Sequence, residues 1–213
     1  MADPTAAARA RMVEEQLRGR GIRDERVLQA FLTVPRHHFV PEPLRAQAYE
    51  DHPLSIGEGQ TISQPYIVAL MLQALRLQGP MSTARVLEVG AGSGYQTALL
   101  CLLALEVYTV ERVPMLAAMA EERLQSFGMR NAHVRVGDGA AGWPEAAPFD
   151  AIVVSAAAHR VPPALLEQLD EGGRLVMPLG GPQSQTLALL HRQGDRITTT
   201  SLGGCVFVPL ITS

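Results

Sequence analysis

Long hydrophobic runs and cysteines are scarce in this sequence. The longest apolar run, Ala98 to Leu105, has eight residues, whereas a membrane-spanning helix needs about 20. The two cysteines, Cys101 and Cys205, are too few for a small fold held together by disulfides. We therefore expect a soluble, cytoplasmic protein without membrane association, in which both thiols are reduced and buried.

An excess of basic residues is also lacking. The 18 Lys and Arg residues face 21 Asp and Glu residues, which gives a net charge of −3, and a protein that follows phosphate backbones needs clustered basic residues. We therefore expect no nucleic-acid partner. The N-terminal residues show no hydrophobic segment of the kind found in secretory signals, so we expect no such signal. With 213 residues, 47% of them hydrophobic, the chain can bury one sizeable core, which excludes collagen-like and disordered classes.

Short β-branched runs alternate with helical runs after residue 80. This alternation is typical of an α/β fold with a mostly parallel sheet covered by helices on both faces. The expected strands are 86–89, 107–110, 134–136, 151–154 and 175–177, and the expected helices are 95–104, 115–127 and 163–169. Two apolar runs around Gly194 and Asp195 predict an antiparallel pair at the C-terminal edge of the sheet.

The first 80 residues are mostly helical in pattern. Asp24 is the predicted N-cap of a helix that runs to Val34, and a second apolar stripe starts at Pro65 and ends at Gly79-Pro80. Four prolines between residues 35 and 53 predict an irregular connection. We expect a single domain over residues 1–213, with an N-terminal helical extension (1–80) and an α/β core with C-terminal strands (81–213).

Three glycines follow the first expected strand of the core. Gly90, Gly92 and Gly94 lie between Val89 and the helix that starts near Tyr95. Glycines in this place let the backbone bend tightly and let a ligand approach it closely. The free N–H groups at the start of the helix suit an anionic group. The loop therefore predicts a site for a nucleotide-like ligand.

The spacing and the neighbouring acids distinguish between nucleotides. A dinucleotide fingerprint needs a third glycine where this chain has the bulky Tyr95. Glu111 and Asp138 end the next two expected strands, where carboxylates can accept hydrogen bonds from ribose hydroxyls and adenine. This combination favours S-adenosylmethionine, which carries a sulfonium instead of phosphates. The alternative is that both carboxylates only cap solvated turns.

The segment from Gly57 to Pro65 allows two interpretations. Ser63 can cap a helix that has Pro65 in its first turn. The glycines, hydroxyls and amides before it can instead form a flexible polar clamp near the mouth of a site.

Together, several motifs resemble the protein-L-isoaspartate (D-aspartate) O-methyltransferase family. They are Gly59-Gln60-Thr61-Ile62-Ser63-Gln64-Pro65, the glycine loop from Leu87 to Thr97, Gly137-Asp138-Gly139, Gly172-Gly173-Arg174-Leu175 and Val206-Phe207-Val208-Pro209-Leu210, with Arg20-Gly21-Ile22 and Val34-Pro35-Arg36-His37 upstream. The resemblance covers roughly residues 11 to 210. The string from Gln60 to Pro65 is far more specific than the glycine loop, which many methyltransferases share.

The resemblance implies a Rossmann-like class I S-adenosylmethionine-dependent methyltransferase fold. It implies methylation of the free α-carboxylate of L-isoaspartyl residues in damaged proteins, with D-aspartyl residues as a second substrate class, and repair through a methyl ester and a succinimide. S-adenosylhomocysteine would be the product, no metal would be needed, and the first 80 residues would supply a substrate clamp. Isoaspartyl proteins and peptides would be the partners of an enzyme expected to be a monomer.

The resemblance also implies roles for single residues. Ser63 would be catalytic, and the substrate would lie against Thr61, Ile62, Gln64, Val208, Pro209 and Leu210. The cofactor would lie against Glu88, Gly90, Ala91, Gly92, Ser93, Gly94, Tyr95, Glu111, Arg112, Asp138 and Gly139. The chain departs from the family pattern at Ser55, at His159-Arg160 and at Ile211.

The expected reaction needs little from side-chain chemistry. A carboxylate has a pKa of about 4, so at neutral pH it is already the nucleophile and needs no general base. The six histidines show no metal-ligand spacing. Two other functions stay open: a carboxyl methyltransferase of the same fold that converts a dedicated peptide to an aspartimide, and a cofactor-binding module without catalysis.

Overall fold

The computed structural model describes residues 4–77 and 83–212. Its helices are α1 (Ala6–Arg11), α2 (Glu25–Thr33), α3 (Pro65–Leu75), α4 (Tyr95–Cys101), α5 (Pro114–Ser126) and α6 (Pro163–Glu167), with short helical segments η1 (Met12–Leu17), η2 (Arg18–Arg20), η3 (Arg36–Phe39), η4 (Glu42–Gln47), η5 (Gly139–Ala141) and η6 (Pro144–Ala146). The strands are β1 (Leu54–Gly57), β2 (Gln60–Ile62), β3 (Arg85–Val89), β4 (Glu106–Glu111), β5 (Ala132–Val136), β6 (Phe149–Val154), β7 (Leu169–Gly181), β8 (Ser184–Gln193) and β9 (Arg196–Cys205).

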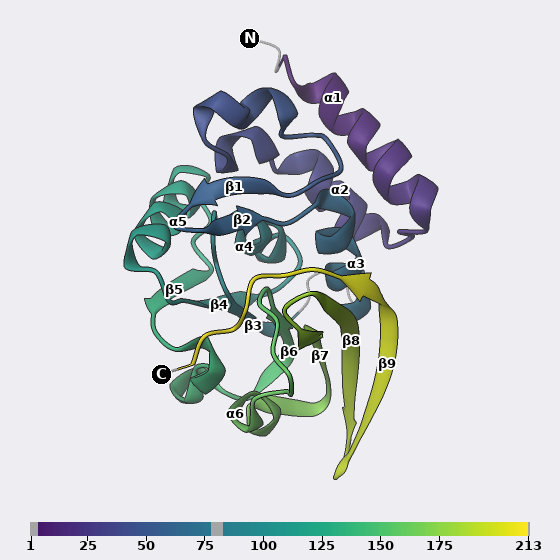
Figure 1. Cartoon of the computed structure of the whole chain (residues 1–213), viewed down its shortest axis with the longest axis vertical. Coiled ribbons are helices and arrows are strands. Elements are labelled where there is room, and N and C mark those ends of the chain that lie inside the picture. Colours follow the sequence, from purple (N-terminus) through teal and green to yellow (C-terminus); the bar gives the residue numbers. More distant parts are fainter. Residues whose placement is uncertain (1–3, 78–82, 213) are drawn as a thin grey trace.

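The main sheet is mostly parallel and has the strand order β5-β4-β3-β6-β7-β8-β9. The first five strands in this order are parallel, and β8 and β9 are antiparallel to their neighbours (Figure 1). The α/β fold and the antiparallel C-terminal edge are therefore confirmed. The chain leaves the centre of the sheet in opposite directions from β3 and β6, and ligands of such sheets bind at the carboxyl ends of the strands beside this switch.

The expected elements exist, but some of their ends differ. Helix α4 ends at Cys101 instead of residue 104, because the chain must turn for the backbone N–H of Leu105 to reach the carbonyl of Ala84. Helix α6 ends at Glu167, and Leu169 already belongs to β7, which pairs it with Phe149.

The two helices predicted for the N-terminal part are confirmed as α2 and α3. Asp24 caps α2 by accepting hydrogen bonds from the backbone N–H groups of Arg26 and Val27. Helix α3 begins at Pro65 and ends at Leu75, because Arg76 adopts a left-handed conformation, so it ends before the predicted stop at Gly79-Pro80. Gly79, Pro80 and the boundary between residues 80 and 81 lie outside the described residues. The proline-rich connection holds the short helices η3 and η4.

The polar segment before α3 forms a β-hairpin where the sequence predicted a loop. Strands β1 and β2 pair Leu54 with Ile62, and the turn Glu58-Gly59 joins them. Gly57 at the end of β1 and both turn residues have positive φ. Strands this short carry too few residues for a recognisable alternation. The N-cap of α3 is Gln64, so the interpretation of Ser63 as a helix cap is wrong.

The buried side chains form two clusters, one on each face of the sheet. One cluster joins the N-terminal helices to alternate strand residues such as Val86 and Val107. The other contains the sequence neighbours of these residues, such as Leu87, together with Phe149 of β6 and Leu165 of α6. This alternation follows from the two-residue period of a strand. The N-terminal helices therefore pack against one face of the sheet and share a hydrophobic core with it.

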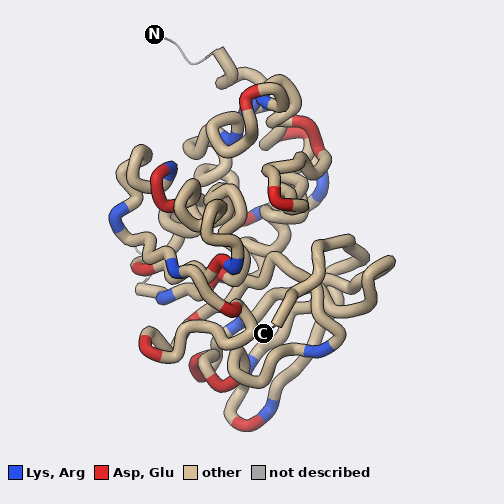
Figure 2. The backbone as a smooth tube through the Cα atoms, turned by 60° about the vertical axis from the view of Figure 1, so that its left-hand side comes forward, with Lys and Arg blue, Asp and Glu red and all other residues tan. Residues whose placement is uncertain are grey.

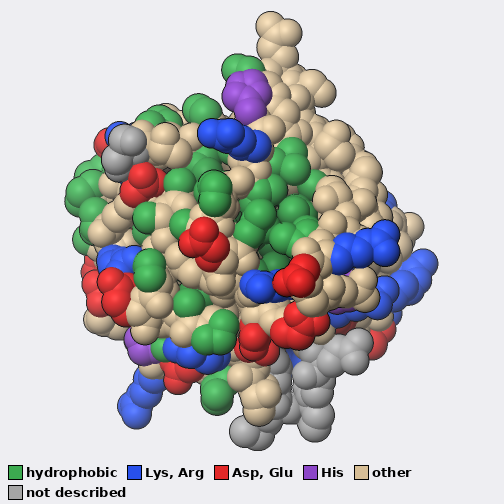
Figure 3. All heavy atoms as spheres, turned by 90° about the horizontal axis from the view of Figure 1, so that it is seen from below, with side chains coloured by type: hydrophobic (Ala, Val, Ile, Leu, Met, Phe, Trp, Pro, Cys, Tyr) green, Lys and Arg blue, Asp and Glu red, His purple; other side chains and the backbone are tan. Residues whose placement is uncertain are grey.

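Charges are spread over the molecule. Figure 2 shows acidic and basic positions interspersed along the chain, and Figure 3 shows both signs among hydrophobic side chains on one face. Both cysteines are free thiols, Cys101 buried as expected and Cys205 only partly buried because it ends the edge strand β9. Over residues 4–77 and 83–212, every helix is too short or too polar to cross a bilayer.

Candidate active site

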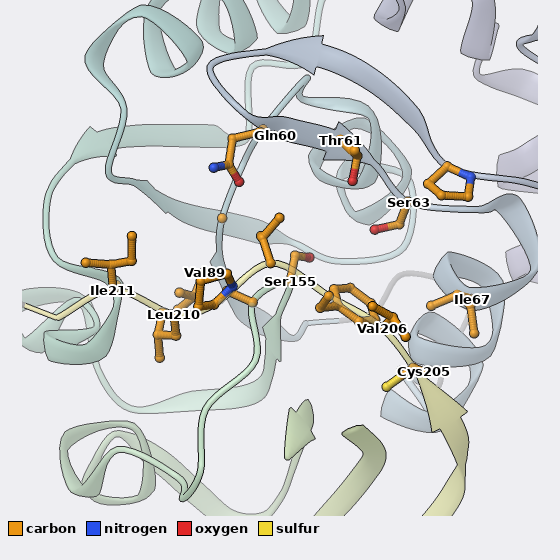
Figure 4. A pocket seen from close by; sticks show the side chains of 18 of the residues that line it. Gln60, Thr61, Ser63, Ile67, Val89, Ser155, Cys205, Val206, Leu210 and Ile211 are labelled. Carbon is orange, nitrogen blue, oxygen red and sulfur yellow. The ribbon is translucent and has the colours of Figure 1, made fainter. Parts of the chain in front are cut away.

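A cavity of about 840 Å³ lies at the carboxyl ends of the central strands (Figure 4). Its walls come from three parts of the chain: the loops after the strands of the core, the β2–α3 segment, and the C-terminal segment that follows β9. Figure 1 shows this last segment running across the sheet below the β1–β2 hairpin. The lining residues are Pro53, Gln60, Thr61, Ser63, Gln64, Ile67, Val89, Gly90, Gly92, Val110, Glu111, Arg112, Val113, Gly139, Ser155, Ala156, Ser184 and residues 204–211.

The glycine loop needs glycine for two different reasons. Gly90, Gly92 and Gly94 all have φ in the left-handed region, at 92°, 53° and 84°, which disfavours other residues. A side chain at Gly94 would also lie 3.2 Å from Ala120 on α5. Gly90 and Gly92 expose their backbone in the cavity, so the loop offers a ligand an approach that no Cβ obstructs.

Glu111 is fixed at the edge of this loop. Its Oε2 accepts a hydrogen bond from the backbone N–H of Gly92 at 2.8 Å, and its Oε1 accepts one from Val113 at 2.9 Å. The carboxylate is almost fully buried, yet it lines the cavity. Carboxylate oxygens can accept further hydrogen bonds, and this oxygen-rich wall suits the hydroxyls of a ribose.

Asp138 supports the neighbouring wall. Its side chain accepts a hydrogen bond from the backbone N–H of Ala140 at 2.9 Å and caps η5. Gly139 lines the cavity, and a side chain there would collide with Val89. The turn after β5 therefore keeps its backbone close to the cavity.

Six of the predicted cofactor residues do not line the cavity: Asp138, which is partly exposed, and the buried Glu88, Ala91, Ser93, Gly94 and Tyr95. Glu88 is fully buried and accepts hydrogen bonds from Gln96 and Thr97. Tyr95 packs edge-on against Phe31 and Phe39. These side chains hold the glycine loop in shape from the core side.

The β2–α3 segment forms the opposite wall. Thr61, Ser63 and Gln64 line the cavity, whereas Ile62 is buried on the other side of β2. Asp51 holds the segment by accepting hydrogen bonds from the Gln64 side chain at 2.8 Å and from the backbone N–H of Tyr66 at 3.4 Å. In Figure 4, the hydroxyls of Thr61 and Ser63 point into the cavity.

The C-terminal segment closes the third side. The backbone N–H of Leu210 donates to the carbonyl of Ala157 at 2.7 Å, and the N–H of Ala157 donates to Val208 at 2.8 Å. Val208, Pro209 and Leu210 all line the cavity. Only one edge of this extended segment is used by these bonds, which suits it to hold a peptide backbone along the other.

The family model of protein-L-isoaspartate(D-aspartate) O-methyltransferase matches residues 8–213. The chain belongs to this family. It is 54% identical to protein-L-isoaspartate O-methyltransferase 1 of Syntrophobacter fumaroxidans over 204 residues, which are 96% of this chain and 94% of the relative. It is also 54% identical to the enzyme of Methanoculleus marisnigri over 210 residues, which are 99% of this chain and 94% of the relative.

Solved structures agree with this assignment. A protein-L-isoaspartate O-methyltransferase structure matches with a TM-score of 0.84 and 29% identity over 94% of this chain and 65% of that one. A structure from Plasmodium falciparum, in complex with S-adenosyl-L-homocysteine, matches with a TM-score of 0.82 and 26% identity over 96% of this chain and 99% of that one. The class I methyltransferase fold is confirmed.

The cavity of this family member fits S-adenosylmethionine. The glycine cradle and the Glu111 carboxylate suit a ligand with ribose hydroxyls. Among the described residues that line the cavity, Arg112 is the one basic residue, which suits a ligand without phosphates. The described residues contain no group of three metal-ligating side chains.

Sequence reasoning missed part of the lining. Ser155 and Ala156 follow β6 and line the cavity beside the glycine loop. The rule that ligands meet the carboxyl ends of parallel strands could have found them. Gln60 belongs to the predicted polar clamp but was not named as a site residue. Ile67 on α3 and Cys205 at the end of β9 reach the cavity through tertiary packing.

Proposed function

We propose that this chain transfers a methyl group from S-adenosylmethionine to the free α-carboxylate of L-isoaspartyl residues in damaged proteins and peptides. The observation that carries this proposal is the meeting of three walls in one cavity: a glycine cradle with Glu111, a hydroxyl-bearing segment with Ser63, and an extended backbone at 208–210. Membership of the family supplies the reaction type.

The cofactor side is formed by the strand ends. Gly90, Gly92, Glu111, Arg112 and Gly139 would contact the cofactor, because they line the cavity. The other predicted cofactor residues, Glu88, Ala91, Ser93, Gly94, Tyr95 and Asp138, would act by holding the loops that carry these contacts. When bound, S-adenosylmethionine supplies an electron-poor methyl group on a sulfonium.

The substrate side is formed by the β2–α3 segment and the C-terminal segment. Ser63 would donate a hydrogen bond to one carboxylate oxygen and leave the other free to attack, and Thr61 and Gln64 would hold the adjoining groups. Ile62, which is buried behind β2, would shape this wall from behind. The backbone of Val208, Pro209 and Leu210 would align the peptide.

The chain's contribution to the rate is alignment. The carboxylate is already ionised at neutral pH, so no side chain must remove a proton. The attacking carboxylate and the sulfonium both lose charge during transfer, so correct orientation and exclusion of water matter more than added charge. Orientation of this kind contributes roughly 7–11 kcal/mol to a bimolecular step.

The product explains how repair follows. The ester carbonyl can expel methoxide, whereas a carboxylate has no comparable leaving group. The neighbouring backbone nitrogen therefore attacks the ester carbonyl, loses its proton, and closes a succinimide with release of methanol. Hydrolysis of the succinimide returns part of the material to normal aspartate. D-aspartyl residues present a related carboxylate, and we propose them as a second substrate class.

A matched pair of peptides tests the function. The purified protein is incubated with methyl-labelled S-adenosylmethionine and two peptides that differ only in an isoaspartyl or aspartyl linkage. We expect base-labile label in the isoaspartyl peptide alone, and a D-aspartyl version measures the second class. Equal labelling of both linkages, or none, would contradict the proposal.

We also propose that the chain acts as a single-domain monomer in the cytoplasm. The shared core of the N-terminal helices and the sheet supports one domain, and the two free thiols suit a reducing compartment. Light scattering after gel filtration should give the mass of one chain, 22.9 kDa, and a doubled mass would contradict the monomer.

A further inference from the structure

Ser155 lies where the cofactor loop meets the substrate segment. It directly follows β6, and its backbone N–H donates to the carbonyl of Val89 at 2.9 Å. A Cβ on Gly90 would lie 3.5 Å from the Cβ of Ser155. Two residues later, Ala157 pairs with the segment around Pro209. The Ser155 side chain therefore lines the cavity between the two parts that hold the reactants.

The direction of its hydroxyl is set by Gln96. The Gln96 Nε2 donates to Ser155 Oγ at 3.0 Å and to Glu88 Oε1 at 3.1 Å, which uses both hydrogens of the amide. Ser155 Oγ is thus an acceptor in this contact and keeps its own hydrogen to donate. Among the described residues, Ser155 Oγ donates no hydrogen bond, and the hydroxyl faces the cavity (Figure 4).

Glu88 fixes the orientation of the Gln96 amide. The Glu88 side chain is fully buried, and its Oε2 accepts a hydrogen bond from the Thr97 hydroxyl at 2.5 Å. When Glu88 is ionised, a flipped Gln96 amide would place its oxygen against the Glu88 oxygen, where two acceptors would face each other. Burial raises the pKa of Glu88 to about 7, while the hydrogen bonds from Thr97 and Gln96 oppose that rise.

We propose that the Ser155 hydroxyl is a second hydrogen-bond donor to the isoaspartyl carboxylate, opposite Ser63, and that Gln96 and Glu88 are its positioning residues. Figure 4 shows the two serine hydroxyls entering the cavity from different walls. Two donors fixed on separate elements would set both the position and the rotation of the carboxylate. This inference rests on the proposed function.

Steady-state kinetics with an isoaspartyl peptide test the role of Ser155. Ser155→Ala is expected to lower kcat/KM by about tenfold to a hundredfold, as for a lost hydrogen bond to a charged group, with a higher KM for the peptide. Ser155→Thr, which keeps the hydroxyl, is expected to stay within about threefold of wild type. Ser201→Ala, on the exposed face of β9, is the matched control and should leave the kinetics unchanged.

Two further measurements separate this role from a structural one. The affinity for S-adenosylhomocysteine by calorimetry should change by less than about twofold in Ser155→Ala. The double variant Gln96→Leu/Ser155→Ala should lose no more kcat/KM than the larger of the two single losses, because both act through one hydroxyl. Thermal unfolding confirms that each variant is folded.

The outcomes separate this inference from the proposed function. A wild-type protein that does not label the isoaspartyl peptide would overturn both. An active wild type with an equally active Ser155→Ala variant would overturn the role of Ser155 alone. A parallel loss of peptide kinetics and S-adenosylhomocysteine affinity would also overturn it, because the hydroxyl would then face the cofactor.

Discussion

The Arg36 guanidinium donates a hydrogen bond from Nη2 to the backbone carbonyl of Ser63 at 2.8 Å. Its Nε donates to the carbonyl of Ala48 at 2.8 Å, and the guanidinium lies 4.9 Å from the centre of the Tyr95 ring. Arg36 is fully buried, and burial lowers its pKa to about 10, so it stays charged at neutral pH. Arg36, a buried cation in η3, thus links the proline-rich connection at Ala48 to Ser63, the residue proposed to act on the substrate.

Replacing Arg36 should affect stability and catalysis together. Arg36→Lys keeps the charge but loses the planar fork that reaches two carbonyls. We expect the free energy of unfolding to fall by roughly 1–3 kcal/mol, as for buried groups left unsatisfied, and kcat to fall at temperatures where the variant is folded. Arg45→Lys, at an exposed position of η4, is the control for denaturation and kinetics. Unchanged kcat in folded Arg36→Lys would separate Arg36 from the positioning of Ser63.

Ser63→Ala should lower turnover far more than cofactor affinity. Ser63 lies on the β2–α3 wall, opposite the glycine loop, and its side chain does not cap α3. We expect kcat for an isoaspartyl peptide to fall at least about tenfold, while the calorimetric affinity for S-adenosylhomocysteine stays near the wild-type value. Unchanged turnover would remove Ser63 from the active role.

Asp138→Ala should weaken cofactor binding. The variant loses the hydrogen bond that caps η5 and frees the turn that places Gly139 on the cavity. We expect a roughly tenfold weaker Kd for S-adenosylmethionine. Asp138→Asn keeps a capping oxygen and should lose less. Equal affinity in Asp138→Ala and wild type, measured by calorimetry, would refute this role.

Glu88 should make the stability of the protein depend on pH. Burial raises the pKa of Glu88 from 4.5 to about 7, so the folded protein holds this proton more tightly than the unfolded chain. The resulting stabilisation is fully present below the unfolded value and is lost as the pH rises through about 7.

Glu88→Gln removes this titration. Between about pH 5 and pH 8 the free energy of unfolding of wild type should fall relative to that of Glu88→Gln by up to about 3 kcal/mol. Urea denaturation at several pH values measures the difference, and Glu121→Gln on the exposed side of α5 is the control. If the difference in the free energy of unfolding between wild type and Glu88→Gln did not change with pH, the raised pKa of buried Glu88 would be contradicted.

Sequence patterns predicted those parts of the fold whose conformation depends on residues close together in the chain. The Asp24 cap and the glycine loop follow from residue types whose conformational preferences act within a few residues. The hairpin of β1 and β2 did not, because its strands are stabilised by packing of Leu54 and Ile62 into the core, which neighbouring residues do not reveal.

The same distinction applies to the site. Motifs identified residues of all three walls. They did not separate residues that line the cavity, such as Ser63 and Gly90, from buried ones in the same motifs, such as Ile62 and Glu88. Ser155 was missed because it carries no motif of its own. Ser155 directly follows the predicted strand 151–154, and the pairing of β6 with β3 sets it beside the glycine loop.

The most direct test of the repair reaction follows one isoaspartyl peptide through complete turnover. The peptide is incubated with the protein and excess S-adenosylmethionine, and the linkage is followed by chromatography against synthetic standards. The account predicts a transient methyl ester, then a succinimide, and a growing fraction of the normal aspartyl peptide that needs both the protein and the cofactor. An isoaspartyl peptide that stays unchanged, or a succinimide that accumulates as a stable end product, would contradict it.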